Sequence, residues 1–397
     1  MSKELNQTEK NDIEKILKQL AEITVKNSFY PNIGLLSGLM GETLFLYEYS
    51  QINPKYLETV EKNIDLIFES IENGNVYHTY CNGLSGICLG LEYILSRIDN
   101  DHQPFDFVSP EIDDWLTDKL VESLEAKNWD FLHGGVGIGF YFLKKFNLGF
   151  KSAEKQLDIL LNFLNEYSVN HNGLTIWKTD KDRVNISLSH GMTSIVLFLL
   201  ELYNSEFKST INIENLIKES IQYILSQKID PAIYNSYFPS TSLEENDNLV
   251  GSRLAWCYGD LGIALMLKKA SLTFNNKVWN DKSNQILEYS TKRKNFSETL
   301  IVDAGICHGC SGVTLFFLKE YLLTNNNLYQ DAYKFWLTKT IDYCNEDYEH
   351  FSKVFYNTLS KEYETNTNLL EGTSGLGLTL ISCLNNQNLS WSEFFLI

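Results

Sequence analysis

Two patterns of apolar and polar residues alternate along the chain. In the first, apolar residues recur at every third or fourth position, as in Ile13, Ile16, Leu17, Leu20 and Ile23, and again in Leu57, Val60, Ile64, Ile67 and Ile71. That spacing predicts helices with a single apolar face. In the second, nearly every residue is apolar, as in residues 87–95, 138–143, 263–267 and 313–318. Segments of this kind suit helices that are buried on every side.

A glycine-rich signature precedes the apolar segments. Seven copies occur: SGLMG at 37–41, NGLSG at 82–86, HGGVG at 133–137, HGMTS at 190–194, YGDLG at 258–262, HGCSG at 308–312 and EGTSG at 371–375. The first glycines of the copies (Gly38, Gly83, Gly134, Gly191, Gly259, Gly309 and Gly372) lie 45 to 68 residues apart, which leaves room for two helices in each copy. Seven copies in matching context indicate a repeat architecture.

The repeat predicts an all-α fold, an α/α toroid in which seven apolar helices form an inner barrel and seven amphipathic helices wrap it. We expect residues 1–397 to form a single domain of seven helix pairs. The glycines should allow crowded backbones to approach and should permit turn dihedrals that other residues resist. Residues 172–186 and 229–250 break the helical period, so we expect long loops there, with short strands, near one mouth of the barrel.

Composition and charge exclude several classes of protein. A hydrophobic fraction of 44% supplies a large core, and the formal net charge of -18 argues against a nucleic-acid partner. The charged N-terminus has no apolar signal region, and no segment reaches the roughly 18 uninterrupted apolar residues of a membrane span. We therefore expect a cytoplasmic protein. Its seven cysteines are then free thiols or metal ligands rather than a disulfide framework.

Two of these cysteines occupy equivalent positions in consecutive copies. Cys257 and Cys307 each stand two residues before a first glycine, and His308 follows Cys307. In a toroid such positions converge where the inner helices begin. Two thiolates and one imidazole suit a zinc ion, and a set of three protein ligands leaves the open position of a catalytic site.

Cys310 leaves two alternatives open. It follows Cys307 by three residues and would complete a closed structural zinc site with four protein ligands. The Cys307-x-x-Cys310 spacing also matches a redox pair, but no βαβ pattern accompanies it. We rank the open zinc site first, the closed one second and the redox pair third.

Other polar residues share the same region of the repeat. His133 and His190 each stand one residue before a first glycine, as His308 does, and Asp130 stands four residues before Gly134. A histidine at a buried helix start also has a simple structural role, because it can cap backbone groups, and we assign that role to His133. The remaining cysteines, Cys81, Cys88, Cys344 and Cys383, are expected to be core thiols.

At these residues the chain resembles the lanthionine synthetase C family of lanthipeptide cyclases. The resemblance rests on the segment SRLAWCYGD at 252–260 followed by CHG at 307–309, and it covers nearly the whole chain. It implies one zinc ion held by Cys257, Cys307 and His308, with water in the fourth position until a substrate cysteine replaces it. It also implies acid/base roles for Asp130 and His190, and places for Arg253, Trp256 and Tyr258 beside the metal.

The implied reaction adds cysteine thiols to dehydroalanine or dehydrobutyrine within a dehydrated precursor peptide and then protonates the resulting enolate. Zinc would deprotonate the thiol. We expect His190 to serve as proton donor or as base, Asp130 to orient it, and Arg253 to stabilise the enolate oxygen. Trp256 and Tyr258 also have a simpler interpretation as packing residues.

The resemblance implies partners, and two alternative functions remain. No dehydratase region is recognisable, so we expect a stand-alone cyclase of the class I kind, served by a separate dehydratase and an exporter. A protein prenyltransferase also combines an α/α toroid with a thiol-activating zinc, but its ligand set includes an aspartate and it lacks the SRxAWCYGD motif. A zinc protein that binds glutathione or a peptide thiol without turnover is the other alternative.

Overall fold

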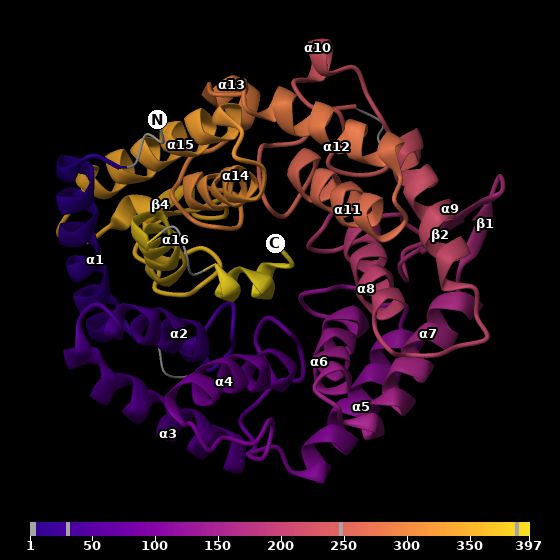
Figure 1. Ribbon diagram of the computed structural model, residues 1–397, viewed down its shortest axis with the longest axis horizontal. Coiled ribbons are helices and arrows are strands. Elements are labelled where there is room, and N and C mark those ends of the chain that lie inside the picture. Colours follow the sequence, from indigo (N-terminus) through magenta and orange to yellow (C-terminus); the bar gives the residue numbers. More distant parts are fainter. Residues whose placement is uncertain (1–4, 29–31, 246–248, 386–388) are drawn as a thin grey trace. The chain divides into compact units, whose positions relative to one another are not determined.

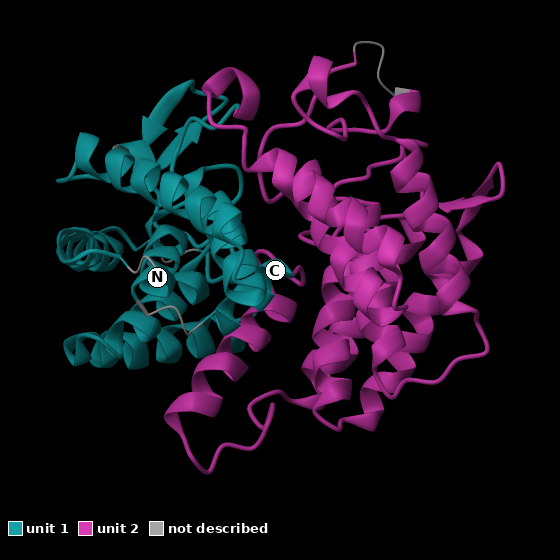
Figure 2. Cartoon of the chain, turned by 45° about the horizontal axis from the view of Figure 1, so that its top comes forward, with its two compact units in different colours: residues 1–76, 300–397 teal, residues 77–299 magenta. Residues whose placement is uncertain are grey.

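The computed structural model describes residues 5–28, 32–245, 249–385 and 389–397. The chain divides into two compact units, of which unit 1 combines Met1–Val76 with Leu300–Ile397 and unit 2 is Tyr77–Thr299 (Figure 2). Unit 1 therefore joins the two ends of the sequence. Unit 2 is continuous.

Unit 2 contains four pairs of an apolar and an amphipathic helix. The apolar helices α4 (Leu84–Ile98), α6 (Gly135–Asn147), α8 (Met192–Asn204) and α11 (Asp260–Thr273) each follow a glycine signature. They pack in that order, each against the next. The amphipathic helices are α5 (Pro110–Glu125), α7 (Glu154–Glu166), α9 (Ile213–Ser226) and α12 (Lys277–Ser290), and Figure 1 shows them along one side of the row formed by α6, α8 and α11.

Unit 1 contains the other three pairs. Its apolar helices are α14 (Cys310–Thr324), α16 (Thr373–Asn385) and α2 (Leu39–Ser50), and its amphipathic helices are α15 (Asn327–Glu346), α1 (Gln7–Asn27) and α3 (Leu57–Glu72). Helix α16 packs on α14, on α2 and on α1, so the last repeat adjoins the first. A hydrogen bond of 2.9 Å between the Thr24 and Thr373 hydroxyls joins α1 to α16.

Burial follows the two patterns predicted from the sequence. All twelve residues of α2 are buried, whereas α1 buries Ile13, Ile16, Leu17, Leu20 and Ile23 along one face. In α3 the buried stripe includes Val60, Ile64 and Ile67, but Leu57 at its start is 36% exposed. The expected alternation of buried and one-sided helices is confirmed.

The loop before six of the seven apolar helices is closed by one hydrogen bond. The amide after the first glycine donates to the carbonyl six residues before that glycine, in Leu39→Asn32, Leu84→Tyr77, Gly135→Asn128, Met192→Asn185, Cys310→Asp303 and Thr373→Asn366. A Cβ on the first glycine would lie 2.2–2.7 Å from the same carbonyl oxygen. Close approach is therefore the reason for glycine in these six copies.

The expected need for unusual turn dihedrals holds only in the fifth copy. Gly259 has φ +80°. Gly38 and Gly191, in contrast, are extended, with φ -154° and -152°, a conformation that any residue adopts. Arg253 stands six residues before Gly259, and the amide of the residue after it, Leu254, donates to the carbonyl of Thr299. The loop that carries Cys257 is thus built differently from the others.

Neighbouring loops are joined by backbone hydrogen bonds at one equivalent position, two residues before the first glycine. In unit 2, Cys81 donates to Leu132 at 2.9 Å and Ser189 donates to Cys257 at 3.2 Å. In unit 1, Cys307 donates to Leu370 at 2.9 Å, and Leu370 donates to Leu36 at 2.8 Å. Within each unit the signature loops therefore lie side by side.

Short strands and helices occupy the remaining connections. Two antiparallel hairpins pair β1 (Val169–His171) with β2 (Leu174–Ile176) and β3 (Phe355–Asn357) with β4 (Glu362–Glu364). The expected loop at 172–186 thus begins within the first hairpin. The loop at 229–250 includes α10 (Pro231–Tyr234) and η3 (Leu243–Glu245), and its residues 246–248 lie outside the described ones. The second hairpin was not predicted.

The other short elements are α13 (Phe296–Thr299), η1 (Pro54–Tyr56), η2 (Lys151–Ala153), η4 (Ser352–Val354) and η5 (Ser390–Phe395). Within the described ranges, no helix combines the length and apolar character needed to cross a bilayer.

Candidate functional site

His190 and Asp130 form a hydrogen-bonded pair in unit 2. The distance from His190 Nδ1 to Asp130 Oδ2 is 2.6 Å. The other carboxylate oxygen of Asp130 accepts the amides of Leu132 and His133 at 2.7 and 2.8 Å. Because the carboxylate is fixed by the loop of the third copy, it holds Nδ1 of His190 as the donor and leaves Nε2 on the opposite side of the ring.

The two histidines near Asp130 have opposite pKa shifts. Burial by itself lowers the pKa of His190, but the hydrogen bond and charge of Asp130, together with the electrostatic effect of Cys257, outweigh burial and raise it above its ordinary value. The pKa of His133 is lowered by burial, against the pull of Asp130. His190 is therefore the histidine of this pair suited to carry a proton near neutral pH.

We expected His133 to cap backbone groups, but among the described residues only its backbone atoms make hydrogen bonds. Its ring stacks beside the His190 ring with centroids 6.3 Å apart. The Tyr258 ring approaches His190 at 5.9 Å. His190 thus lies among two aromatic rings and one carboxylate.

The loop of Cys257 adjoins the loop of His190. Both the amide and the hydroxyl of Ser189 donate to the Cys257 carbonyl at 3.2 Å. Cys257 is buried and Arg253 is half-buried. Trp256 is completely buried, which is compatible with the simpler of its two interpretations, that of a packing residue.

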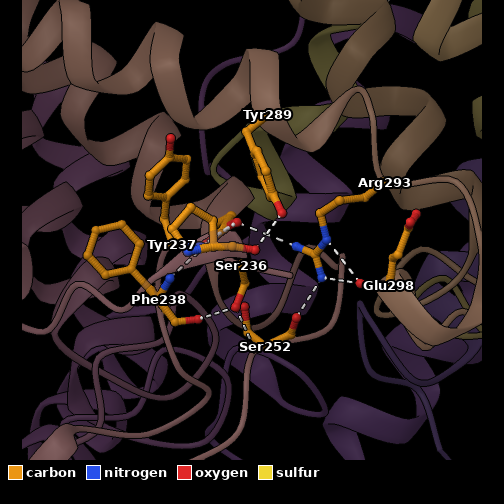
Figure 3. A network of polar contacts seen from close by, with 9 residues as sticks. Ser236, Tyr237, Phe238, Ser252, Tyr289, Arg293 and Glu298 are labelled. Atoms are coloured by element: carbon orange, nitrogen blue, oxygen red, sulfur yellow. Dashed lines mark hydrogen bonds and ion pairs between the residues drawn. The ribbon is translucent and has the colours of Figure 1, made fainter. Parts of the chain in front are cut away.

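A buried polar network holds both ends of the loop that carries Cys257 (Figure 3). Arg293 donates to the carbonyls of Ser252 and Glu298, both at 2.6 Å, and lies 3.4 Å from the Asp260 carboxylate. Asp260 also accepts the amides of Tyr237 and Phe238 at 3.0 Å. Burial raises the pKa of Asp260 to about 6, although Arg293 and the two amides lower it. Both ends of the segment 252–260 are therefore fixed by buried groups.

A cavity of about 350 Å³ opens beside the hydrogen-bonded pair, and Asp130 and His190 form part of its wall. Trp129, Trp177 and Met192 provide apolar surface, and the remaining lining includes polar groups such as Asn128, Asn185 and Thr179. The pair is therefore reached from a recess with mixed walls, as suits a peptide side chain.

Unit 1 places Cys307 and His308 at the start of α14. Nε2 of His308 lies 3.3 Å from the Asp303 carboxylate, and Asp303 is buried. Glu371, in the neighbouring loop, has its pKa raised by burial, with His308 acting in the opposite direction. His308 therefore has a buried carboxylate at one ring nitrogen.

Cys257 of unit 2 and Cys307 and His308 of unit 1 have side chains of the kinds that could hold a metal ion. Cys310 is the first residue of α14 and is buried, and burial raises the pKa of its thiol well above the ordinary value. Two cysteines and one histidine suit zinc.

The four remaining cysteines, Cys81, Cys88, Cys344 and Cys383, are buried as expected. Three polar residues were missed: Asp303, Asp260 and Arg293. Asp303 could have been found by extending the comparison of the copies upstream, because asparagine stands at its position in four of them. Arg293 carries no repeat signal, since its partners become neighbours only in the folded chain.

Comparison with known proteins identifies the family. The model of lanthionine synthetase C-like proteins matches residues 30–396. The chain belongs to this family. The enzyme class expected from the two motifs, a thioether-forming lanthionine synthetase, is thereby confirmed at the level of the family.

Individual relatives in the family are distant in sequence. The nisin biosynthesis protein NisC of Lactococcus lactis subsp. lactis is 24% identical over 403 residues, which cover 94% of this chain and 91% of that protein. The solved structure of a nisin cyclase matches with a TM-score of 0.71 at 21% identity and covers 98% of both chains. The chain thus has the α/α toroid fold predicted from its repeats.

Proposed function

We propose that this protein is a zinc-dependent lanthipeptide cyclase, which adds cysteine thiols to dehydroalanine or dehydrobutyrine within a dehydrated precursor peptide. The family supports this reaction class, and the relative NisC is named for nisin biosynthesis. The observation that carries the proposal is the pair of Ser189 hydrogen bonds to the Cys257 carbonyl. They join the loop of the acid/base histidine to the loop of a candidate metal ligand.

Cys257, Cys307 and His308 would hold one zinc ion. Their side chains supply ligands that zinc prefers. Bound zinc would convert a substrate thiol, whose pKa is ordinarily about 8.5, into a coordinated thiolate. Since the two protein thiolates offset the charge of the ion, the substrate sulfur would remain nucleophilic.

Residues of this chain would carry out the proton transfer. As the sulfur bonds to the β-carbon, the π-electrons of the Cα=Cβ bond move toward the carbonyl oxygen and form an enolate. The α-carbon then takes up one proton, which balances the proton that the thiol lost. Nδ1 of His190 is held by Asp130, so Nε2 would take and give this proton. Arg253, on the segment before Cys257, would stabilise the enolate oxygen. Tyr258 would position the His190 ring, which it contacts.

The seven repeats, residues 1–397, would act as one domain, which the family model over residues 30–396 supports. The reaction consumes dehydroamino acids without making them, so a separate dehydratase must supply the substrate, in the cytoplasm, and an exporter would remove the product. The alternative is zinc-dependent binding of a glutathione or peptide thiol without ring closure. The test below distinguishes this alternative from the cyclase.

The test is to incubate the zinc-loaded protein with dehydrated precursor peptides and to count free thiols by alkylation and mass spectrometry, since cyclisation leaves the mass unchanged. We expect thiols to disappear with the wild-type chain. The Cys307→Ala variant should bind no zinc and leave the thiols free. Thiols that persist with every precursor despite one zinc per chain would refute the cyclase, and normal zinc content in Cys307→Ala would refute the ligand set.

A further inference from the structure

Asp303 occupies a position at which four other copies have asparagine. Six residues before the first glycine stand Asn32, Asn128, Asn185 and Asn366, and Asp303 is the equivalent residue in the sixth copy. In all five, a side-chain oxygen accepts the amide two residues later at 2.8–3.3 Å: Gly34, Asp130, Ser187, Asn368 and Gly305. The turn itself therefore needs an oxygen but no carboxylate.

The second side-chain atom shows the difference between the two residue types. The amide nitrogen of Asn128 donates to the His133 carbonyl at 3.1 Å, and that of Asn32 donates to the Ser37 carbonyl at 2.9 Å. In each case the acceptor belongs to the residue just before the first glycine. An asparagine at this position thus presents a donor to the rest of its loop.

Asp303 presents a second acceptor instead. Its Oδ2 accepts the amide of Tyr356 at 3.2 Å and lies 3.3 Å from Nε2 of His308. Its side chain is only 1% exposed, so these contacts are made away from solvent. The Tyr356 amide is a donor, which an asparagine nitrogen at the place of Oδ2 could not satisfy.

We propose that Asp303 is a positioning residue that fixes His308 with its proton on Nε2 and directs Nδ1 to the metal. The inference rests on the proposed zinc site. The two histidines that stand just before a first glycine and contact a carboxylate are then oriented in opposite ways. Asp130 holds Nδ1 of His190, whereas Asp303 holds Nε2 of His308, and a carboxylate partner of this kind sets the tautomer of a metal-binding histidine.

Asp303→Asn is the decisive variant, because four other loops show that asparagine supports the turn. Its oxygen would keep the Gly305 bond, and its NH2 group would face Nε2 of His308. Nε2 would then accept, which moves the imidazole proton to Nδ1 and blocks that nitrogen as a ligand. We expect the dissociation constant for zinc, measured on the full chain by competition with a chromophoric chelator, to rise about 10- to 100-fold.

Asn32→Ala is the matched control. It removes a turn of the same kind in the same unit, at a loop without a candidate metal ligand, so zinc affinity should not change. As a second readout, long-range proton–nitrogen NMR of the metal-free protein should show His308 protonated on Nε2 in the wild type and on Nδ1 in Asp303→Asn. This readout does not depend on zinc binding.

Wild-type zinc affinity together with an unchanged His308 tautomer in Asp303→Asn would overturn the inference. An equal loss of affinity in Asn32→Ala would also overturn it, because the effect would then come from the turn. Failure of the zinc site itself is separate: it would appear as no zinc in the wild type, or as no loss in His308→Ala.

Discussion

The chemistry of a residue in this repeat depends on a partner outside the glycine signature. His133, His190 and His308 stand at one equivalent position, yet His190 meets a carboxylate through Nδ1, His308 meets one through Nε2, and His133 stacks on a neighbouring ring. The signature thus indicates where a side chain lies. Its proton and its role follow from carboxylates outside the signature, Asp130 for His190 and Asp303 for His308.

His190→Asn should separate metal binding from proton transfer. The variant removes the imidazole but touches none of the three candidate ligands, so we expect one zinc per chain and a cyclisation rate lower by about 10²- to 10⁴-fold. Zinc is measured by atomic emission and rate by the alkylation assay. Loss of zinc from this variant, or an unchanged rate, would contradict the role of His190.

At the scale of helices and loops, the sequence was sufficient where periodicity decides the structure. The buried stripe of α1 and the total burial of α2 follow from residue spacing alone. The β3–β4 hairpin could not be predicted, because its three-residue strands are too short to show alternation. The same holds for the positive φ of Gly259, since the signature of the fifth copy resembles the others while its upstream residue, Arg253, does not.

Gly259→Ala should disturb the Cys257 loop more than a positive φ alone explains. A Cβ at this glycine would lie 1.9 Å from Ser252 Oγ and 2.4 Å from Ser252 Cβ. Gly173 has the similar φ of +84° with nothing within 4 Å, so Gly173→Ala is the matched control. We expect urea unfolding to show Gly259→Ala less stable than Gly173→Ala by about 1–3 kcal/mol. Equal losses of stability in the two variants would show that Ser252 can move away from the added Cβ at no cost.

Arg293→Met tests the network behind that loop. It leaves Asp260 as a buried carboxylate without its cation and two carbonyls without a donor, which should cost about 3–5 kcal/mol at pH 8. The pKa of Asp260 is already about 6, above its ordinary value, and losing Arg293 raises it further. When the folded-state pKa of an acid is raised, the folded protein loses stability as the pH rises from the ordinary pKa through the raised one. The stability difference between Arg293→Met and the wild type should therefore be smaller at pH 5 than at pH 8.

The control for this network is Lys277→Met, which removes the cation of an exposed ion pair with Asp281. An exposed pair contributes less than about 1 kcal/mol, so its loss should change the stability little in either measurement. Unfolding curves at pH 5 and pH 8 measure both variants. A pH-independent deficit in Arg293→Met would mean that Asp260 does not titrate with folding.

At the scale of the whole molecule, the repeat explains why two distant parts of the sequence make one unit. The seventh copy bonds to the first through Leu370 and Leu36, and α1 packs on α16, so unit 1 is built from both ends of the chain. The equivalent positions and the family model, which spans residues 30–396, support the single domain that we propose. What the sequence could not provide is the division into two units.

Zinc removal should reveal how far the metal stabilises the whole chain. Each unit has its own buried helices, so we expect the chelated protein to remain helical by circular dichroism. A ligand present at 1,000 times its dissociation constant adds about 4 kcal/mol to the native state. For a chain of this length that corresponds to a decrease in Tm of about 5 °C when the metal is withdrawn, since unfolding entropy scales with residue number. The Cys307→Ala variant should melt at the lower temperature with or without chelator, because it has no complete ligand set to lose. If chelation lowered the Tm of Cys307→Ala as much as that of the wild type, the stabilising ion would have to be bound elsewhere.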